Sequence, residues 1–253
     1  MNFKYLAILA ALPIAFTACK KDEEAPAPTP VPTTGTVNMA FNLFVGDSPL
    51  DLSANYQDGA GHAIKFTKVK FYVSNVHLMD DNEVVLGHYE DTYILVDASN
   101  VNNTFTLGSL SPAEVHGAEI TFGLGPDVNN SDPLTMEAPL NDPDMMWAWS
   151  TFAGRMFLKL EGRVDGNNDG DLEDSEDPTF LYHCLNQNGD LLRETHVHVH
   201  ADVMAGGTST LSTKVDLGVV VSGLDLLMNP EAMDGGSQCV LAMDSLAASI
   251  SEL

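Results

Sequence analysis

The chain has 253 residues, of which 44% are hydrophobic and 8% are aromatic, so it can bury a core of ordinary size. Its length allows one domain of about 200 residues or two smaller ones. Eleven basic residues stand against 36 acidic ones, which gives a formal net charge of −25. That charge repels nucleic acid and anionic lipid but suits metal cations, so nucleic acid is excluded as a partner.

Residues 1–18 have the pattern of an export signal. Lys4 supplies a positive charge, residues 5–16 form an apolar run too short to span a bilayer, and small residues precede Cys19. The pattern resembles a bacterial lipoprotein signal, in which Cys19 becomes the lipidated start of the mature chain. A plain secretory signal with an incidental cysteine is the alternative.

Residues 19–35 are expected to form a tether. The charged run at 20–24 resembles the tag that follows the cysteine of lipoproteins displayed on the outer membrane of some Gram-negative bacteria. Residues 25–34 contain four prolines and predict an extended segment of about 3 Å per residue. We therefore expect a cell-envelope protein that is anchored by lipid to the outer membrane. Its domain at 36–253 would stand off the membrane, in the periplasm or at the cell surface.

The domain at 36–253 shows the alternation of short β-strands separated by turn signals such as Asp58-Gly59 and Ser111-Pro112. Strands are predicted at 36–45, 64–69, 71–78, 92–98 and 118–124. This pattern predicts an all-β fold, a single antiparallel β-sandwich or a barrel-like variant. Short helices are expected only at 222–228 and 237–253.

Residues 165–176 match the twelve-residue calcium-binding loop, with a glycine at the sixth position for the sharp turn. Runs that read as strands precede and follow the loop, so it is expected to be a structural clip rather than a sensor that opens between two helices. An acidic surface loop without an ion is the alternative. The predicted ligands are Asp165, Asn167, Asp169, Asp171 through its carbonyl, and Glu176.

Two cysteines remain if Cys19 carries lipid. In an oxidising compartment Cys184 and Cys239 are expected to form a disulfide, which would stabilise the fold by about 4 kcal/mol in the chain-entropy model. A Cys184 thiolate that binds copper is the alternative. The disulfide is favoured because an exposed thiol outside the cytoplasm tends to be oxidised.

Residues 194–202 read as a strand with three histidines, His196, His198 and His200, at every second position of one face. Neighbouring side chains on that face lie about 6.6 Å apart, so two imidazoles can reach one zinc or copper ion at about 2 Å. The outer two lie about 13 Å apart, too far for one ion to hold all three. The expected site is one pair plus a ligand from elsewhere, and a solvent-facing strand without metal is the alternative.

The missing ligand is sought among the other histidines. His183 lies on the strand after the calcium-type loop, and a hairpin through residues 186–190 would pair that strand with the histidine strand. His77, on an earlier strand, is the second candidate. His62, His88 and His116 are expected in turns, exposed to solvent. Imidazole suits both copper and zinc, whereas methionine thioethers would select Cu(I).

Five stretches carry a resemblance to a known family: Lys68–Leu78, Tyr93–Asp97, Ile120–Gly125, Met146–Trp149 and Phe157–Gly162. They occur in the order seen in the MbnP-like family, copper-associated exported β-proteins named from methanobactin gene clusters. The resemblance extends over residues 35–227. It implies copper handling at the cell surface or in the periplasm.

The same resemblance gives the tryptophans an expected role. In that family a tryptophan of the paired motif can be oxidised to kynurenine by a partner di-haem enzyme of the MauG type. Related copper proteins bind Cu(I) through two histidines and a kynurenine. Trp147 and Trp149 match the motif, and Trp147 is the first candidate for modification. Core packing is the alternative role for both.

The residues do not complete an enzyme site. The chain has no histidine after His200, which leaves the metal sites of superoxide dismutases and cupins incomplete. A zinc enzyme built on three histidines would also need a proton acceptor and a substrate pocket. We therefore expect a copper-binding protein that is not an enzyme. The alternative is a calcium-stabilised surface module that binds a protein or glycan through histidine and tryptophan.

Overall fold

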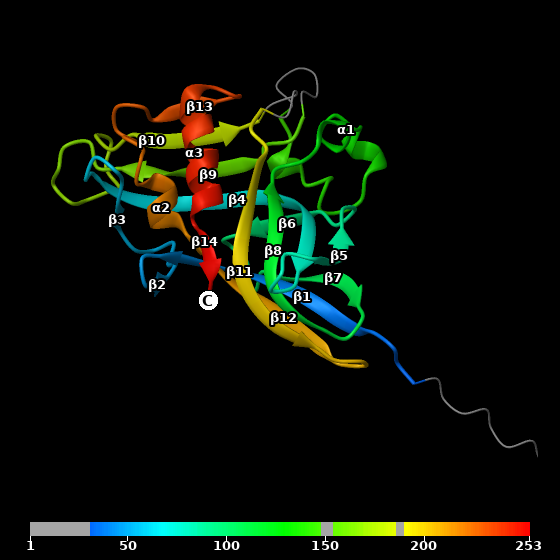
Figure 1. Cartoon of the computed structure of the whole chain (residues 1–253). Helices are drawn as coiled ribbons and strands as arrows, with labels where there is room; N and C mark the ends of the chain where they lie inside the picture. The colour runs from blue at the N-terminus through cyan, green and yellow to red at the C-terminus, as the bar shows by residue number, and fades with distance from the viewer. Residues whose placement is uncertain (1–30, 148–153, 186–189) are drawn as a thin grey trace, which may run out of the picture. The chain divides into compact units, whose positions relative to one another are not determined.

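Two β-sheets make up most of the structure, a computed structural model that describes residues 31–147, 154–185 and 190–253 (Figure 1). Each sheet is open, with different strands at its two edges, and both contribute to one hydrophobic core. The predicted all-β sandwich is confirmed. Its sheets are mixed rather than purely antiparallel, because β1 pairs with β12, and β10 with β13, in parallel.

The smaller sheet has five strands among the described residues, in the order β14-β12-β1-β2, and β7 pairs with another part of β1. The parallel pairing runs from Thr36 opposite Thr208 to Phe44 opposite Asp216, so the start of the domain is fixed against a segment near its end. The strands are β1 (Gly35–Val45), β2 (Ser48–Pro49), β7 (Thr104–Leu110), β12 (Thr208–Asp216) and β14 (Ile250–Glu252).

The larger sheet has nine strands in the described part of the chain, with β11-β8-β4-β9-β10-β13 along its main path. Strand β4 is the central strand of this sheet. Its first half pairs with β9, its second half pairs with β8, and β3, β6 and β5 also pair with it. The strands are β3 (Tyr56–Gln57), β4 (Ala63–Met79), β5 (Val85–Tyr89), β6 (Ile94–Asp97), β8 (Ala113–Phe122), β9 (Leu158–Val164), β10 (Thr179–Cys184), β11 (Arg193–Val203) and β13 (Glu231–Met233).

The two strands predicted at 64–69 and 71–78 are one continuous strand of 17 residues. Lys70, which lies between them, keeps its register partners on both sides, Asp97 of β6 and Lys159 of β9. A long strand spanning two sets of partners bends at irregularities, and β4 shifts register against β9 near Phe66 and against β8 after Ser74.

Helices are short. They are α1 (Pro126–Asn129), α2 (Leu217–Val221) and α3 (Ser237–Ala248), with 3-10 turns at Pro133–Thr135 and Pro143–Met145. The helix expected at 222–228 is absent; α2 ends at Val221, just before it. In α3 the buried residues Cys239, Ala242, Met243 and Leu246 follow helical spacing, and Cys239 forms a disulfide with Cys184 of β10. No described helix is long and apolar enough to cross a membrane.

The predicted hairpin between the strand of His183 and the histidine strand is wrong. Strand β10 pairs with β9 and β13, whereas β11 pairs with β8 on the far side of β4. The neighbours of β10 are therefore supplied by other segments, including Glu231–Met233 from near the C-terminus. His183 and the three histidines of β11 consequently lie on strands separated by three others in the sheet.

Candidate metal centres

The histidines of β11 lie on its outward face. His196, His198 and His200 are exposed, whereas Val197 and Val199 between them are buried. The rings of His196 and His198 lie 5.3 Å apart between centroids, nearly perpendicular to each other. This pair offers two imidazoles from one strand to a metal ion.

A glycine on the neighbouring strand makes room for this pair. Gly117 of β8 lies opposite His198 in register. A Cβ atom at Gly117 would lie only 2.7 Å from Nε2 of His196. The His196 ring therefore lies over β8, in space that any other residue at position 117 would fill.

His200 belongs to a different group. Its Nδ1 lies 2.9 Å from Oε1 of Glu252, on β14 of the other sheet, and its backbone N–H donates to the same oxygen. Its ring lies 5.1 Å from that of His116 on β8. The expectation of a turn at His116 is wrong, because this residue lies within β8. A register shift between His198 and Ala201 further separates His200 from the pair.

His183 has partners away from β11. Its Nε2 lies 2.7 Å from Oε1 of Glu161 on β9, and its ring lies 6.2 Å from that of Trp147. Trp147 is partly buried and packs against the core. Trp149 lies outside the described residues. The structure thus brings His183 to one of the two tryptophans of the motif and not to the histidine strand.

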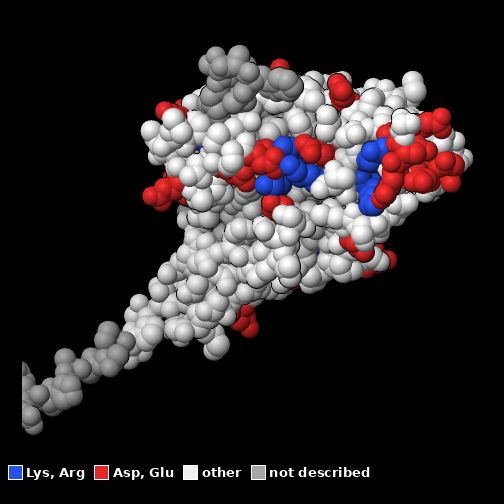
Figure 2. All heavy atoms as spheres, turned by 180° about the vertical axis from the view of Figure 1, so that it is seen from behind, with Lys and Arg blue, Asp and Glu red and all other residues white. Residues whose placement is uncertain are grey.

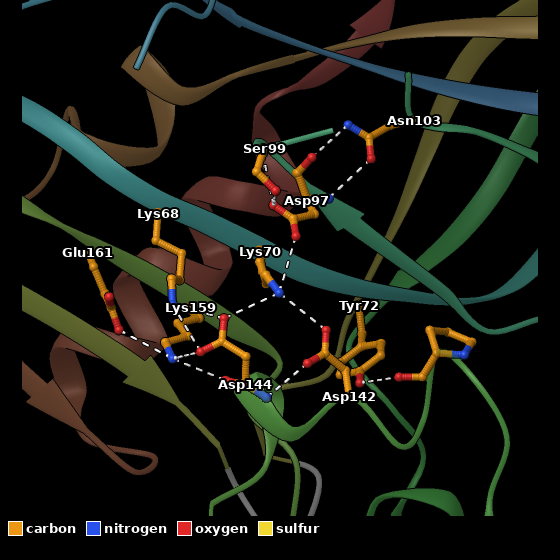
Figure 3. A network of polar contacts seen from close by, with 11 residues as sticks. Lys68, Lys70, Tyr72, Asp97, Ser99, Asn103, Asp142, Asp144, Lys159 and Glu161 are labelled. Carbon is orange, nitrogen blue, oxygen red and sulfur yellow. Dashed lines mark hydrogen bonds and ion pairs between the residues drawn. The ribbon is translucent and has the colours of Figure 1, made fainter. Parts of the chain in front are cut away.

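A network of ion pairs (Figure 3) extends to Glu161, the partner of His183. Asp144 is its centre, with its oxygens 2.6 Å from Nζ of Lys159, 2.9 Å from Nζ of Lys68 and 3.2 Å from Nζ of Lys70. Lys159 in turn lies 3.4 Å from the Glu161 carboxylate that holds His183. On the face drawn in Figure 2, Lys and Arg side chains form small clusters beside acidic ones.

These contacts govern the protonation of the network. Burial alone would raise the pKa of Asp144, but hydrogen bonds from the three lysines hold it well below its usual range. Burial likewise opposes ionisation of Glu161, and the hydrogen bond with His183 together with the charges of Lys159 and Lys68 lowers its pKa. Both carboxylates are therefore ionised at neutral pH.

Arg155 fixes the segment that carries Asp142, Asp144 and Trp147. It is fully buried, and its guanidinium donates to the backbone oxygens of Leu140, Val128 and Asn129 at 2.5, 2.6 and 3.0 Å. Met146 forms a β-bridge with the backbone of Arg155. Between α1 and Trp147 the described segment is thus held in one position although it forms no long helix or strand.

A third group joins His77 of β4 with His88 and Glu90. Their ligand atoms all lie within 4.8 Å of one another. The prediction that His88 lies in a turn is wrong, because it is part of β5, opposite His77 in register. Sequence reasoning missed His88 and Glu90. The apolar run at residues 84–86, followed by Tyr89, was the available signal for a strand.

His62 lies in a loop, as expected, but its side chain is half-buried and has two carboxylate partners. Its Nδ1 is 3.2 Å from Oδ2 of buried Asp58 and 3.6 Å from Oδ1 of Asp225. Asp58 also accepts hydrogen bonds from the backbone N–H groups of Ala60, His62 and Leu226. These bonds occupy its oxygens and identify this group as a structural tie between two loops.

The calcium-type loop has the backbone form its sequence predicts. Gly170 has φ +84° and Asn168 has φ +64°, the left-handed conformation that tight turns require. Asn167 Nδ2 lies 2.9 Å from both Asp169 Oδ2 and Glu176 Oε2, so three of the predicted ligand side chains converge. Asp165 accepts hydrogen bonds from the backbone N–H groups of Asn168 and Gly170.

Comparison with known proteins identifies the family. The family model named MbnP matches residues 34–235, most of the chain. The chain belongs to the MbnP family. The resemblance predicted from the motif order is thereby confirmed, and this family is associated with methanobactin and with copper handling outside the cytoplasm.

A solved structure shares the MbnP fold of this chain. It is MbnP from Methylosinus trichosporium, which aligns with a TM-score of 0.51 and 18% sequence identity over 81% of this chain and 82% of the other. At that identity the likeness concerns the fold alone. No curated protein matches the chain.

Proposed function

We propose that this protein is a copper-handling lipoprotein of the cell envelope, anchored through Cys19, that binds copper as its cargo through histidine side chains. The observation that carries the proposal is the gathering of histidines on β5, β4, β8 and β11, which are adjacent in the larger sheet. Six of the eight histidines in the sequence lie on these strands: His77, His88, His116, His196, His198 and His200.

Chemistry and family together favour copper. Imidazole suits copper and zinc about equally as a donor, so the residues alone do not choose. Membership of a family associated with copper handling supports the choice. The net charge of −25 raises the local concentration of any metal cation near the surface. Among these six histidines, the proposed copper ligands are His196 and His198 of β11.

We extend the proposal to Trp147 as a residue that a MauG-type di-haem enzyme oxidises to kynurenine. Both atoms of an external dioxygen molecule add as the indole C2–C3 bond breaks, which gives N-formylkynurenine, and hydrolysis then releases C2 as formate. What supports it is the family and the placement of Trp147 beside His183. A kynurenine there would stand next to one imidazole. Mass spectrometry of the peptide containing Trp147, from cells with and without the partner enzyme, tests this step.

We also propose that the loop at 165–176 binds calcium as a structural clip. Its support is the left-handed backbone at Gly170 and the convergence of Asn167, Asp169 and Glu176. The flanking elements β9 and β10 are paired strands, so calcium would stiffen their connection without opening it. The alternative of a glycan- or protein-binding module would need exposed aromatic side chains in a groove, and Trp147 packs against the core.

The test is the metal content of the exported chain, purified without chelator. At least one copper per chain is expected in the unmodified chain, and loss of one copper per chain, with retention of calcium, is expected in His196→Ala/His198→Ala. Asp202→Asn is the matched control, since Asp202 is also exposed on β11. Failure of the parent to bind copper after loading with either Cu(I) or Cu(II) would refute the copper function.

A further inference from the structure

A compact group of metal ligands lies where β5 meets β4. His77 and His88 face each other across the two strands, with ring centroids 4.7 Å apart and planes at 72°. Glu90 follows β5 by one residue, and its carboxylate completes a set of three donors within 4.8 Å of one another. Side chains directly opposite each other on antiparallel strands share one face of the sheet, so the two imidazoles approach from the same side.

A β-bulge places His77 on that face. Between the pairs Ser74–Thr121 and His77–Glu119, β4 has two residues where β8 has one. Asn75, within the bulge, has φ 49°, a conformation that few residues other than glycine adopt. Without the extra residue every side chain from position 76 onward would change faces, and His77 would point into the core. Bulges of this kind often re-aim a side chain beside a functional site.

The two nitrogens of His77 have different surroundings. Nδ1 lies 3.4 Å from Oε1 of Glu119 on β8. Nε2 is buried and forms no hydrogen bond with the described residues. It lies 3.9 Å from Oε1 of Glu90. That separation is too long for a hydrogen bond but leaves room for an ion between the two atoms. A ring nitrogen held by a carboxylate, with the other directed at an open position, is the arrangement of metal-binding histidines.

We propose that His77, His88 and Glu90 bind a divalent transition-metal ion, Zn(II) or Cu(II), and that Glu119 is an outer carboxylate that orients His77. Two imidazoles and a carboxylate are the donor set of open zinc sites, which leave a fourth position for water or another ligand. A cavity of about 220 Å³ adjoins two of the ligands, His77 and Glu90, and has room for that position. Its lining is Asn75, His77, Glu90, Glu119, Thr121 and Glu194.

The donor atoms favour a divalent ion over Cu(I). The described lining contains oxygen and nitrogen donors and no thioether or thiolate, which disfavours Cu(I). Carboxylates of Glu90, Glu119 and Glu194 surround the position, so a doubly charged ion would be neutralised. This site uses neither the β11 histidine pair nor Trp147, and it stands or falls independently of the proposed copper cargo site.

The test compares Zn(II) binding by calorimetry in the exported chain and in His88→Ala, Glu90→Gln and His196→Ala/His198→Ala. Both single variants alter exposed side chains, so their folds should persist. We expect His88→Ala and Glu90→Gln each to weaken Zn(II) binding at this site by at least about 10-fold, because removal of even an outer-shell partner weakens metal sites that much. His196→Ala/His198→Ala should retain this binding. Glu119→Gln should weaken it by about 10–100-fold while leaving thermal unfolding of the metal-free protein unchanged.

Electron paramagnetic resonance of bound Cu(II) supplies a second readout. In the His196→Ala/His198→Ala background the spectrum should show coupling to two nitrogens, and adding His88→Ala should leave one. Parent-like Zn(II) affinity in His88→Ala, or a two-nitrogen spectrum after His88→Ala in that background, would overturn the proposal. Loss of this Zn(II) binding in His196→Ala/His198→Ala, with binding by His88→Ala unchanged, would instead assign the metal to β11.

Discussion

Replacement of Asp144 by asparagine should destabilise the domain more than any exposed charge change. The side chain of Asp144 is 31% exposed, and that of its partner Lys159 is only 9% exposed. Exposed ion pairs contribute about 0.2–1 kcal/mol, whereas removal of one partner from a buried pair costs about 3–5 kcal/mol. Because Asp144 lies between these limits and contacts three lysines, we expect a loss of about 2–3 kcal/mol.

Thermal and urea unfolding measure this loss, which for a domain of this size corresponds to a fall in Tm of about 4–12 °C. Asp47→Asn is the control, since Asp47 is fully exposed and lies 3.9 Å from Lys214. A double-mutant cycle with Lys159→Met should give a coupling of about 1 kcal/mol or more. If Asp144→Asn unfolds within about 0.5 kcal/mol of the control, the network does not stabilise the fold and the reasoning is refuted.

The pH dependence follows from the direction of the pKa shift. The folded pKa of Asp144 is lowered, so its contribution is fully present above the unfolded value of about 4 and is lost as the pH falls through the folded pKa. The difference in stability between parent and Asp144→Asn should therefore be constant at neutral pH. It should shrink only in acid, below about pH 4.

Three further changes test other parts of the structure. Gly162→Ala should cost about 3 kcal/mol or more in urea unfolding, because a Cβ there would lie 2.2 Å from the backbone oxygen of Lys65; parent-like stability would contradict the close strand contact. Calcium at about 10 mM should stabilise the parent by about 1–3 kcal/mol in thermal unfolding, given the weak affinity of extracellular sites, and should not stabilise Glu176→Gln. Asn75→Val should lose about 1–2 kcal/mol through its left-handed backbone, and Asn75→Gly should not.

The sequence predicted what depends on local spacing. The alternation of histidine and valine in β11 places imidazoles outward and valines inward, as period two requires. The loop at 165–176 adopts left-handed φ at Gly170 because its turn geometry is encoded within twelve residues. The family, too, was recognisable, since motif order along the chain needs no three-dimensional information.

The sequence did not predict what depends on strand pairing across the sheet. Consecutive strands pair in most folds, which favoured a hairpin between β10 and β11, but β9 and β13 occupy the edges of β10. The partnership of His77 with His88 depends on the register of β4 and β5. The outward direction of His77 depends on a bulge that a single sequence does not mark. His88 and Glu90 were therefore missed.

The two proposed sites imply different chemistry for copper on one sheet. At His77, His88 and Glu90 the donors are nitrogen and carboxylate oxygen, which favour Cu(II) or Zn(II). The β11 pair offers imidazoles alone, which suit copper and zinc alike. Trp147 lies beside His183 on β10, and three strands separate β10 from β11 in the sheet. Neither ligand set includes Trp147, so Cu(II) should bind at β4–β5 whether or not Trp147 is oxidised. Cu(II) binding there that required the partner enzyme would contradict this separation of the sites.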